Sequence, residues 1–185
     1  MKIKKLAFLS IFCLLFVNSA NAAISISSPD FKDGEVIGEK NIFNGFGCKG
    51  GNISPQIHIS DVPKEAKSLA MTMYDPDAPT GSGWWHWIVY NMPTRTRNIF
   101  ASDQKMSAVA TFGKDAAFGK NDFGTFEYGG PCPPVGHGKH RYILTVYALG
   151  VDKLSLPKDA SGAMIGYNIN ASMLEKASIT AYYQR

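Results

Sequence analysis

The chain has 185 residues, with 19 Lys and Arg against 15 Asp and Glu, and a formal net charge of +4. Three of the lysines and none of the acids lie in the first 22 residues, so the remaining chain has 16 basic against 15 acidic residues, about +1. A balance so close to neutral excludes a strongly basic nucleic-acid surface. The remaining roughly 160 residues are enough for one well-buried domain.

The N-terminal segment has the pattern of a secretory signal. Lysines fill three of the first five positions, residues 6–17 form an apolar run, and Ala20 and Ala22 are small residues at the positions that signal peptidase reads. The apolar run is shorter than a membrane span requires. We therefore expect 1–22 to be a signal peptide and 23–185 the mature domain, with a retained membrane anchor as the alternative.

Most of the mature chain is patterned as β-strand. Short segments alternate apolar and polar residues or concentrate β-branched and aromatic ones, and Gly, Pro, Asn and Asp separate them. The predicted strands are 24–27, 56–60, 69–74, 84–92, 140–149 and 179–183, and the long loops are 44–55, 75–83, 113–124 and 128–139.

One segment near the C-terminus has a different period. The large apolar residues of 161–177 recur at intervals closer to those of a helix, and Asp159 or Ser161 suits the N-cap position. Several strands, long loops and one late helix predict a mainly β fold. We expect a β-sandwich-like single domain with one or two helices near the C-terminus.

Two cysteines, Cys48 and Cys132, remain after Cys13 leaves with the signal peptide. Export makes a disulfide between them the first expectation, and closing a loop of about 85 residues would stabilise the fold by roughly 4–5 kcal/mol in the chain-entropy model. Two unpaired buried thiols are the alternative. A catalytic Cys132 is disfavoured, because free thiols are consumed in an oxidising compartment.

A restricted pair of carboxylates follows the predicted strand 69–74. In Asp75-Pro76-Asp77-Ala78-Pro79, each proline fixes its own φ and pushes the preceding residue toward extended geometry. The positions of both aspartates are therefore well defined. A capped turn is the simpler interpretation of this motif, and a binding site is the alternative.

His86 lies within an aromatic run of the predicted strand 84–92. A period of two predicts two faces for this strand: Trp84, His86, Ile88 and Tyr90 on one, and Trp85, Trp87 and Val89 on the other. A single histidine among tryptophans is more often a satisfied core residue than a ligand-binding one.

A rigid loop leads into a second histidine. Residues 128–139 contain four glycines and three prolines and end immediately before His140-Arg141-Tyr142. The strand period puts His140 and Tyr142 on one face, at the mouth of an apolar surface, which is typical of small-ligand pockets. Arg141 points the other way, where we expect a structural partner such as a carboxylate.

Together these motifs resemble the phosphatidylethanolamine-binding protein family, in its bacterial Raf-kinase-inhibitor-like branch. The resemblance rests on 75–79, the Trp-His pair ending at His86, Gly130-Pro131, and His140-Arg141-Tyr142, with support from 51–55. It implies a β-rich fold with a small cavity for phosphate or a phosphorylated headgroup, and, with the export signal, a periplasmic location. The cavity positions carried over are Asp75, Asp77, Pro79, His86, Pro131, His140 and Tyr142. Cys132 interrupts the family's proline run, which puts the wall position of Pro133 or Pro134 in doubt.

An anion site with two aspartates needs compensating donors. A carboxylate of Asp75 or Asp77 bonded to His86 or His140 would favour the imidazolium form and orient it toward the ligand. Tyr142 and backbone N–H groups of the glycine-rich loop would add neutral donors. We therefore expect weak binding that strengthens as the pH falls from about 8 to about 6, with no cofactor and no metal.

Two other functional classes stay open. Two Asp and two His could form a metal-dependent or acid–base hydrolase of a small phosphoester, although no G-x-S-x-G or H-E-x-x-H motif is present. The family also implies an inhibitor or scaffold acting on a protein target, such as a kinase. We expect a binding protein that is not an enzyme; the sequence leaves homodimerisation open.

Overall fold

A computed structural model describes residues 23–102 and 112–185 of the chain. The predicted signal peptide, with Cys13, lies outside these described residues. The elements are β1 (Ser25–Ser27), η1 (Glu39–Asn41), β2 (Ile57–Ser60), β3 (Ser68–Asp75), β4 (Trp84–Met92), β5 (Asn98–Ile99), β6 (Ala117–Phe118), β7 (His140–Leu149), α2 (Gly162–Ser172) and β8 (Met173–Tyr183).

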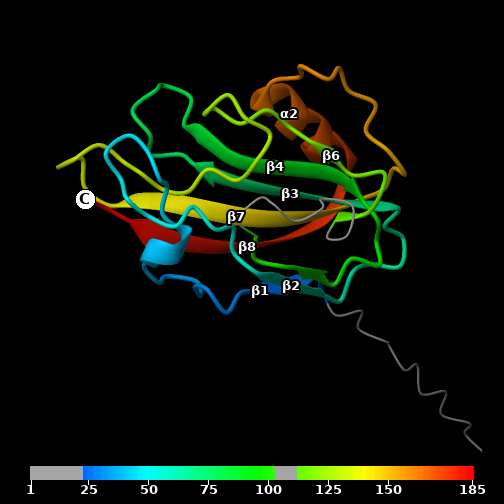
Figure 1. Cartoon of the computed structure of the whole chain (residues 1–185). Helices are drawn as coiled ribbons and strands as arrows, with labels where there is room; N and C mark the ends of the chain where they lie inside the picture. The colour runs from blue at the N-terminus through cyan, green and yellow to red at the C-terminus, as the bar shows by residue number, and fades with distance from the viewer. Residues whose placement is uncertain (1–22, 103–111) are drawn as a thin grey trace, which may run out of the picture.

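Two antiparallel sheets enclose the main core (Figure 1). The smaller sheet has the order β1-β2-β5, and the larger has the order β6-β4-β3-β7-β8. Apolar side chains from both sheets meet between them, for example Ile57 and Ile59 of β2 with Met71 of β3 and Leu144 of β7. Removing such side chains from water is the main stabilising contribution to folding. The predicted mainly β, sandwich-like single domain is confirmed.

Helix α2 covers the opposite face of the larger sheet (Figure 1). Its buried side chains Ile165 and Ile169 pack against Ala70, Ile88 and Leu149 of the sheet. The central strands β3 and β4 are therefore buried on both faces, which explains why their sequences are almost continuously apolar. The resulting layers are small sheet, large sheet and helix.

The predicted faces of β4 are wrong at its start, because the pairing with β3 shifts there. Consecutive residues of β3 pair with Trp87 and Trp85, which leaves His86 without a partner between them. An inserted residue of this kind reverses the alternation of side chains. Trp85 packs with Ile88 on the helix side, whereas the His86 ring lies 5.2 Å from the ring of Tyr142 in the main core.

The predicted helix begins as expected but ends early. The Ser161 side chain accepts a hydrogen bond from the backbone N–H of Met164 at 3.2 Å, so the predicted cap is confirmed. Residues 173–177, predicted to be helical, instead begin β8, which pairs with β7 along its full length. Pairing with the edge of β7 stabilises a strand here more than the local spacing of apolar residues favours a helix. The short elements η1, β5 and β6 were not predicted from the sequence.

Three loops gather where β3 ends and β7 begins. Cys48 and Cys132 form the expected disulfide, with a Cα–Cα distance of 6.0 Å, and so join loop 44–55 to loop 128–139. The β3–β4 connection, residues 76–83, contributes side chains to the same region. Within residues 23–102 and 112–185, no helix has the length and apolar character needed to cross a membrane.

Candidate functional site

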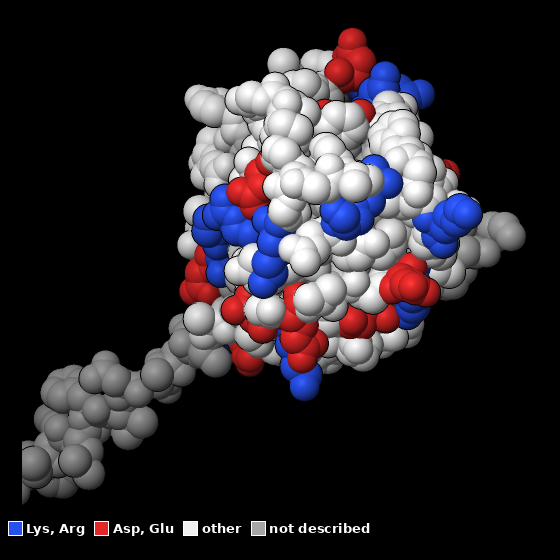
Figure 2. Space-filling model, turned by 90° about the vertical axis from the view of Figure 1, so that its left-hand side faces the viewer, with Lys and Arg blue, Asp and Glu red and all other residues white. Residues whose placement is uncertain are grey.

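A cavity of about 210 Å³ lies among these three loops. It is at the end of the molecule that holds the C-terminus, because the first residue of β7, His140, pairs with Tyr183. Figure 2 faces this end: several basic side chains lie across the middle of the face, and acidic side chains lie mainly below them and at the edges. The lining residues are Phe46, Asp75, Ala78, Pro79, Thr80, Trp84, His86, Phe123, Cys132, Pro133, Pro134, His140 and Tyr142.

A buried carboxylate–imidazole pair forms one wall of the cavity. Asp75 and His140 are 3% and 1% exposed, and Oδ2 of Asp75 lies 2.7 Å from Nδ1 of His140. The other carboxylate oxygen accepts the backbone N–H of Asp77 at 2.8 Å, which uses the turn that the Asp-Pro-Asp sequence predicts. Because a carboxylate only accepts hydrogen bonds, we assign the donated proton to Nδ1 of His140.

The second aspartate of the motif has a different role. Asp77 does not line the cavity; its carboxylate accepts two hydrogen bonds from the Arg141 side chain, at 2.6 and 2.9 Å, and one from the Arg141 backbone N–H at 2.9 Å. The hydrogen bond from Arg141 is the main reason that the pKa of Asp77 is lowered to about 2. The predicted partner for Arg141 is confirmed, and the pair fixes the start of β7 beside the loop after β3.

His86 lies in the cavity wall as a neutral group. Its Nδ1 is 2.7 Å from the carbonyl oxygen of Gly129, which can only accept, so we assign the proton to Nδ1. Burial lowers the pKa of His86 to about 4, because the charged ring would lose its hydration. At neutral pH, His86 therefore supplies shape and a neutral ring, and it is not the imidazolium that the sequence suggested.

Two buried donors on the cavity wall have no hydrogen-bond partner among the described residues: the hydroxyl of Tyr142 and the indole N–H of Trp84. Burial raises the pKa of the Tyr142 phenol, so it remains an O–H donor. Each unpaired buried polar group costs about 1–3 kcal/mol. Sequence reasoning selected Tyr142 but missed Trp84, although an indole N–H beside a predicted site is a signal worth testing.

The two prolines of the predicted site lie in different places. Pro79 lines the cavity, whereas Pro131 does not; its carbonyl oxygen instead accepts the backbone N–H of Phe43 at 3.1 Å. Pro133 and Pro134 both line the cavity, so the cysteine within the proline run leaves this wall in place. The aromatic walls of Phe46 and Phe123 were not predicted.

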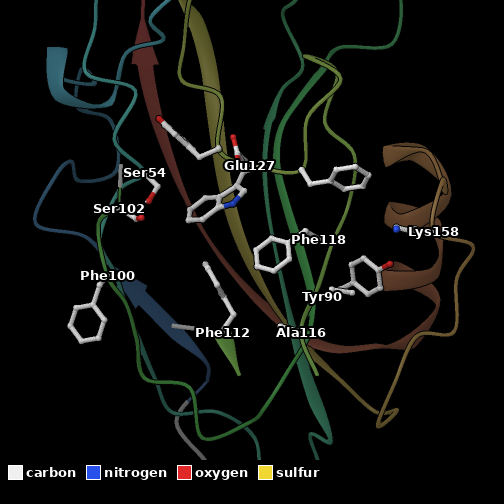
Figure 3. A pocket seen from close by; sticks show the side chains of 13 residues that line it. Ser54, Tyr90, Phe100, Ser102, Phe112, Ala116, Phe118, Glu127 and Lys158 are labelled. Atoms are coloured by element: carbon white, nitrogen blue, oxygen red, sulfur yellow. Dashed lines mark hydrogen bonds between the residues drawn. The ribbon is translucent and has the colours of Figure 1, made fainter. Parts of the chain in front are cut away.

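A second, larger cavity of about 510 Å³ lies at the β4–β6 side of the molecule (Figure 3). Its walls are mainly aromatic, with Phe118, Phe112 and Tyr90 facing the space and Glu127 and Lys158 at its edges. It holds neither of the unpaired donors nor the carboxylate–imidazole pair. Because converging polar groups identify a site better than volume does, we take the smaller cavity as the candidate functional site.

Comparison with known proteins identifies the family of the chain. A family model described as phosphatidylethanolamine-binding protein matches residues 27–184. The chain belongs to the phosphatidylethanolamine-binding protein family. The resemblance seen in its sequence motifs is therefore confirmed.

Individual relatives of this phosphatidylethanolamine-binding protein cover almost its whole length. UPF0098 protein YbcL of Escherichia coli (strain K12) is 40% identical over 181 residues, or 98% of both chains. UPF0098 protein YbhB of the same organism is 42% identical over 160 residues, covering 86% of this chain and 99% of YbhB. The crystal structure of E. coli YbcL, described as a new member of the mammalian PEBP family, has a TM-score of 0.82 at 42% identity, covering 89% of this chain and 99% of that one.

Proposed function

We propose that this phosphatidylethanolamine-binding protein is exported to the periplasm and binds a small phosphorylated or anionic ligand in the smaller cavity. It acts there as a Raf-kinase-inhibitor-like binding protein and not as an enzyme. The observation that carries the proposal is the pair of unpaired donors, Tyr142 O–H and Trp84 N–H, on the wall of a cavity with a buried Asp75–His140 pair. A phosphoryl group offers oxygens to both donors.

No Lys or Arg is among the described residues that line the smaller cavity, which supports neutral donors rather than a cluster of cations as the source of binding. Hydrogen bonds from neutral groups each contribute about 0.5–1.5 kcal/mol, so we expect modest affinity. The guanidinium of Arg141 is already used by Asp77. Asp75 orients the imidazole of His140, which lines the same cavity.

Calorimetric titration tests the ligand class. We expect inorganic phosphate and phosphoethanolamine to bind the mature protein, and Tyr142→Phe to weaken both by about threefold to tenfold. Tyr167→Phe is the matched control, because Tyr167 is 75% exposed on α2. Equal affinities of wild type and Tyr142→Phe would remove the main support for this cavity.

The pH dependence needs a ligand whose own charge is constant. Phosphate monoesters gain a proton near pH 6, whereas the phosphodiester of glycerophosphoethanolamine keeps one negative charge between pH 8 and 6. Its binding should strengthen over this interval, in which histidine side chains gain their charge, and His86 should not contribute, because its pKa is about 4. A constant affinity from pH 8 to pH 6 would contradict a histidine role.

The hydrolase alternative is tested by turnover. Among the described residues, no group of three or more His, Cys, Asp or Glu is placed to hold a metal ion. We expect no release of phosphate from a generic aryl phosphate, with or without added divalent cations. Turnover that His140→Gln abolishes would replace the binding proposal with an enzymatic one.

Export and the protein-target role have separate tests. Mass spectrometry of the periplasmic fraction should find a mature chain that begins at Ala23. If an inhibitor or scaffold role depends on the cavity, Tyr142→Phe should weaken the cellular phenotype together with ligand affinity. An unchanged phenotype would assign the protein-target role to the outer surface.

A further inference from the structure

A third side chain extends the Asp75–His140 pair to the surface. His137, an exposed residue of loop 128–139, places its Nδ1 2.7 Å from Nε2 of His140. This distance equals that between the other nitrogen of His140 and Asp75. Asp75, His140 and His137 therefore form a continuous chain from a buried carboxylate to an exposed imidazole, which we call the histidine chain.

The loop backbone is built to hold His137 in this position. Its two neighbours, Gly136 and Gly138, have φ values of 74° and 89°, a left-handed conformation that glycine adopts readily. The backbone N–H of Gly136 donates to a main-chain oxygen of Arg185 at 2.9 Å. The Arg185 side chain in turn donates from Nε to the carbonyl oxygen of Pro133, on the cavity wall. The C-terminus thus anchors the segment that carries His137.

Counting protons along the histidine chain shows which atom faces outward. Nδ1–H of His140 donates to Asp75, so in a neutral ring Nε2 of His140 is an acceptor. His137 must then donate from Nδ1, which leaves its own Nε2 as the outer nitrogen. A single additional proton is accommodated at that outer nitrogen, whereas two imidazolium rings would place two N–H groups against each other. The two rings can therefore carry only one positive charge while they remain in contact.

We propose that His137 is a ligand-binding residue of the smaller cavity, that it shares one positive charge with His140, and that its Nε2–H donates to a phosphoryl oxygen at the rim. This inference rests on the proposed function and adds a residue to that site. Both nitrogens of His140 are occupied, by Asp75 and by His137. His137 is not itself a lining residue, but it contacts His140, which lines the cavity, and it lies three residues after the lining residue Pro134.

The charges around the histidine chain are compatible with this role. The two imidazoles have Asp75 of β3 at their buried end. Arg141, the residue after His140 in β7, is paired with Asp77. On the cavity wall, His86 and Tyr142 are uncharged at neutral pH. Arg185, which follows β8, donates from its guanidinium to the carbonyl oxygen of Pro133 and brings a positive charge to this loop. Lys139, between His137 and His140 in sequence, lies over the ring of Tyr182.

Nuclear magnetic resonance on the ligand-free protein tests the chain itself. The sequence contains four histidines, so four imidazole signals can be assigned by single substitutions. We expect the ring signals of His140 to show its proton on Nδ1, and His140→Gln to change the ring chemical shifts of His137, because the two rings share a hydrogen bond. His58→Gln is the matched control, because His58 contacts Asn98 on the other sheet. Ring chemical shifts of His137 that are identical in wild type and His140→Gln would overturn the proposal.

Binding of inorganic phosphate and phosphoethanolamine at pH 6.5 tests the ligand contact. A hydrogen bond from a charged donor predicts that His137→Gln weakens binding by about tenfold or more, while His58→Gln has no effect. Unchanged binding, or tighter binding that would make His137 a competitor for His140, would contradict the proposal. If wild type binds neither anion, the proposed function fails, and the spectra of the ligand-free protein still decide whether the two rings are hydrogen-bonded to each other.

Discussion

A buried tyrosine lies on the wall of each cavity, and the two hydroxyls differ in whether they have a hydrogen-bond partner. Tyr128, on the wall of the larger cavity, donates its hydroxyl proton to the carbonyl oxygen of Asn41 at 2.7 Å. Tyr142, on the wall of the smaller cavity, has no partner among the described residues. The hydroxyl of Tyr128 stabilises the fold, whereas the hydroxyl of Tyr142 lowers the stability of the fold and leaves a donor for a ligand. Unmet hydrogen-bonding capacity locates the functional site better than volume does.

The largest expected effect concerns the disulfide that closes the smaller cavity. Replacing both Cys48 and Cys132 by serine should lower the free energy of unfolding by about 4 kcal/mol, because the unfolded chain regains the freedom of a long loop. Cys132 also lines the smaller cavity, so phosphoethanolamine affinity should fall as well. Urea unfolding and calorimetry measure the two effects. Wild-type stability in the double variant would show that the cross-link does not constrain the fold.

A pH-dependent loss of stability should come from the smaller cavity. Burial lowers the pKa of His86 from 6.5 to about 4, so the unfolded chain binds this proton at a higher pH than the native protein does. The stability contribution is fully present above pH 6.5 and is lost as the pH falls toward 4, by about 3 kcal/mol. Urea unfolding at pH 7 and pH 4.5 measures it.

The control for this pH effect is His86→Gln, which retains a donor for Gly129 but cannot titrate. Its stability should change less between pH 7 and pH 4.5 than that of wild type, whereas His58→Gln should behave as wild type. An undiminished pH dependence in His86→Gln would assign the effect to other groups.

The two tyrosines provide the next test. Tyr128→Phe should destabilise the fold by about 1–3 kcal/mol, because the buried carbonyl of Asn41 loses its donor. Tyr142→Phe should leave stability unchanged or raise it, since it removes an unpaired buried hydroxyl, and should weaken phosphoryl binding. Thermal unfolding of both variants is the measurement. Equal destabilisation by the two substitutions would erase the contrast between the cavities.

The smallest expected effect concerns two exposed aromatic residues. Phe46 lines the smaller cavity and is 68% exposed, and Phe100 lines the larger one and is 50% exposed. Phe46→Ser should weaken phosphoethanolamine binding by about twofold to fivefold through lost apolar contact, and Phe100→Ser should have no effect. Both variants should unfold within about 0.5 kcal/mol of wild type. A larger loss from Phe100→Ser would point to the other cavity.

Much of the fold could be predicted from sequence because its strands have clear boundaries. Residues 84–92 and 140–149 begin and end where their aromatic and β-branched composition does, and their structural bounds agree with the prediction. The β8 pairing could not be predicted, because Met173 and Leu174 also satisfy a helical period and only the edge of β7 selects the strand. Local sequence patterns predict most elements, but where a segment suits both a helix and a strand, pairing with a distant strand decides between them.

The candidate site was predictable in its residue types but not in its contacts. Asp75, His86, His140 and Tyr142 were selected from sequence, and all four line one cavity. The register shift that turns His86 toward Tyr142 is invisible in an alternating pattern. Asp75 bonds to His140 in the cavity, whereas Asp77 pairs with Arg141. This difference depends on the position of Arg141, which is far away in sequence. The contribution of Trp84 follows only from its lack of a partner.

A crystal structure of the mature protein grown with phosphate tests the central claim most directly. The account predicts density for the anion in the smaller cavity, with oxygens within hydrogen-bond distance of the Tyr142 hydroxyl and the Trp84 indole nitrogen. A smaller cavity that stays without phosphate density at a concentration well above the Kd from calorimetry, or density in the larger cavity alone, would contradict it.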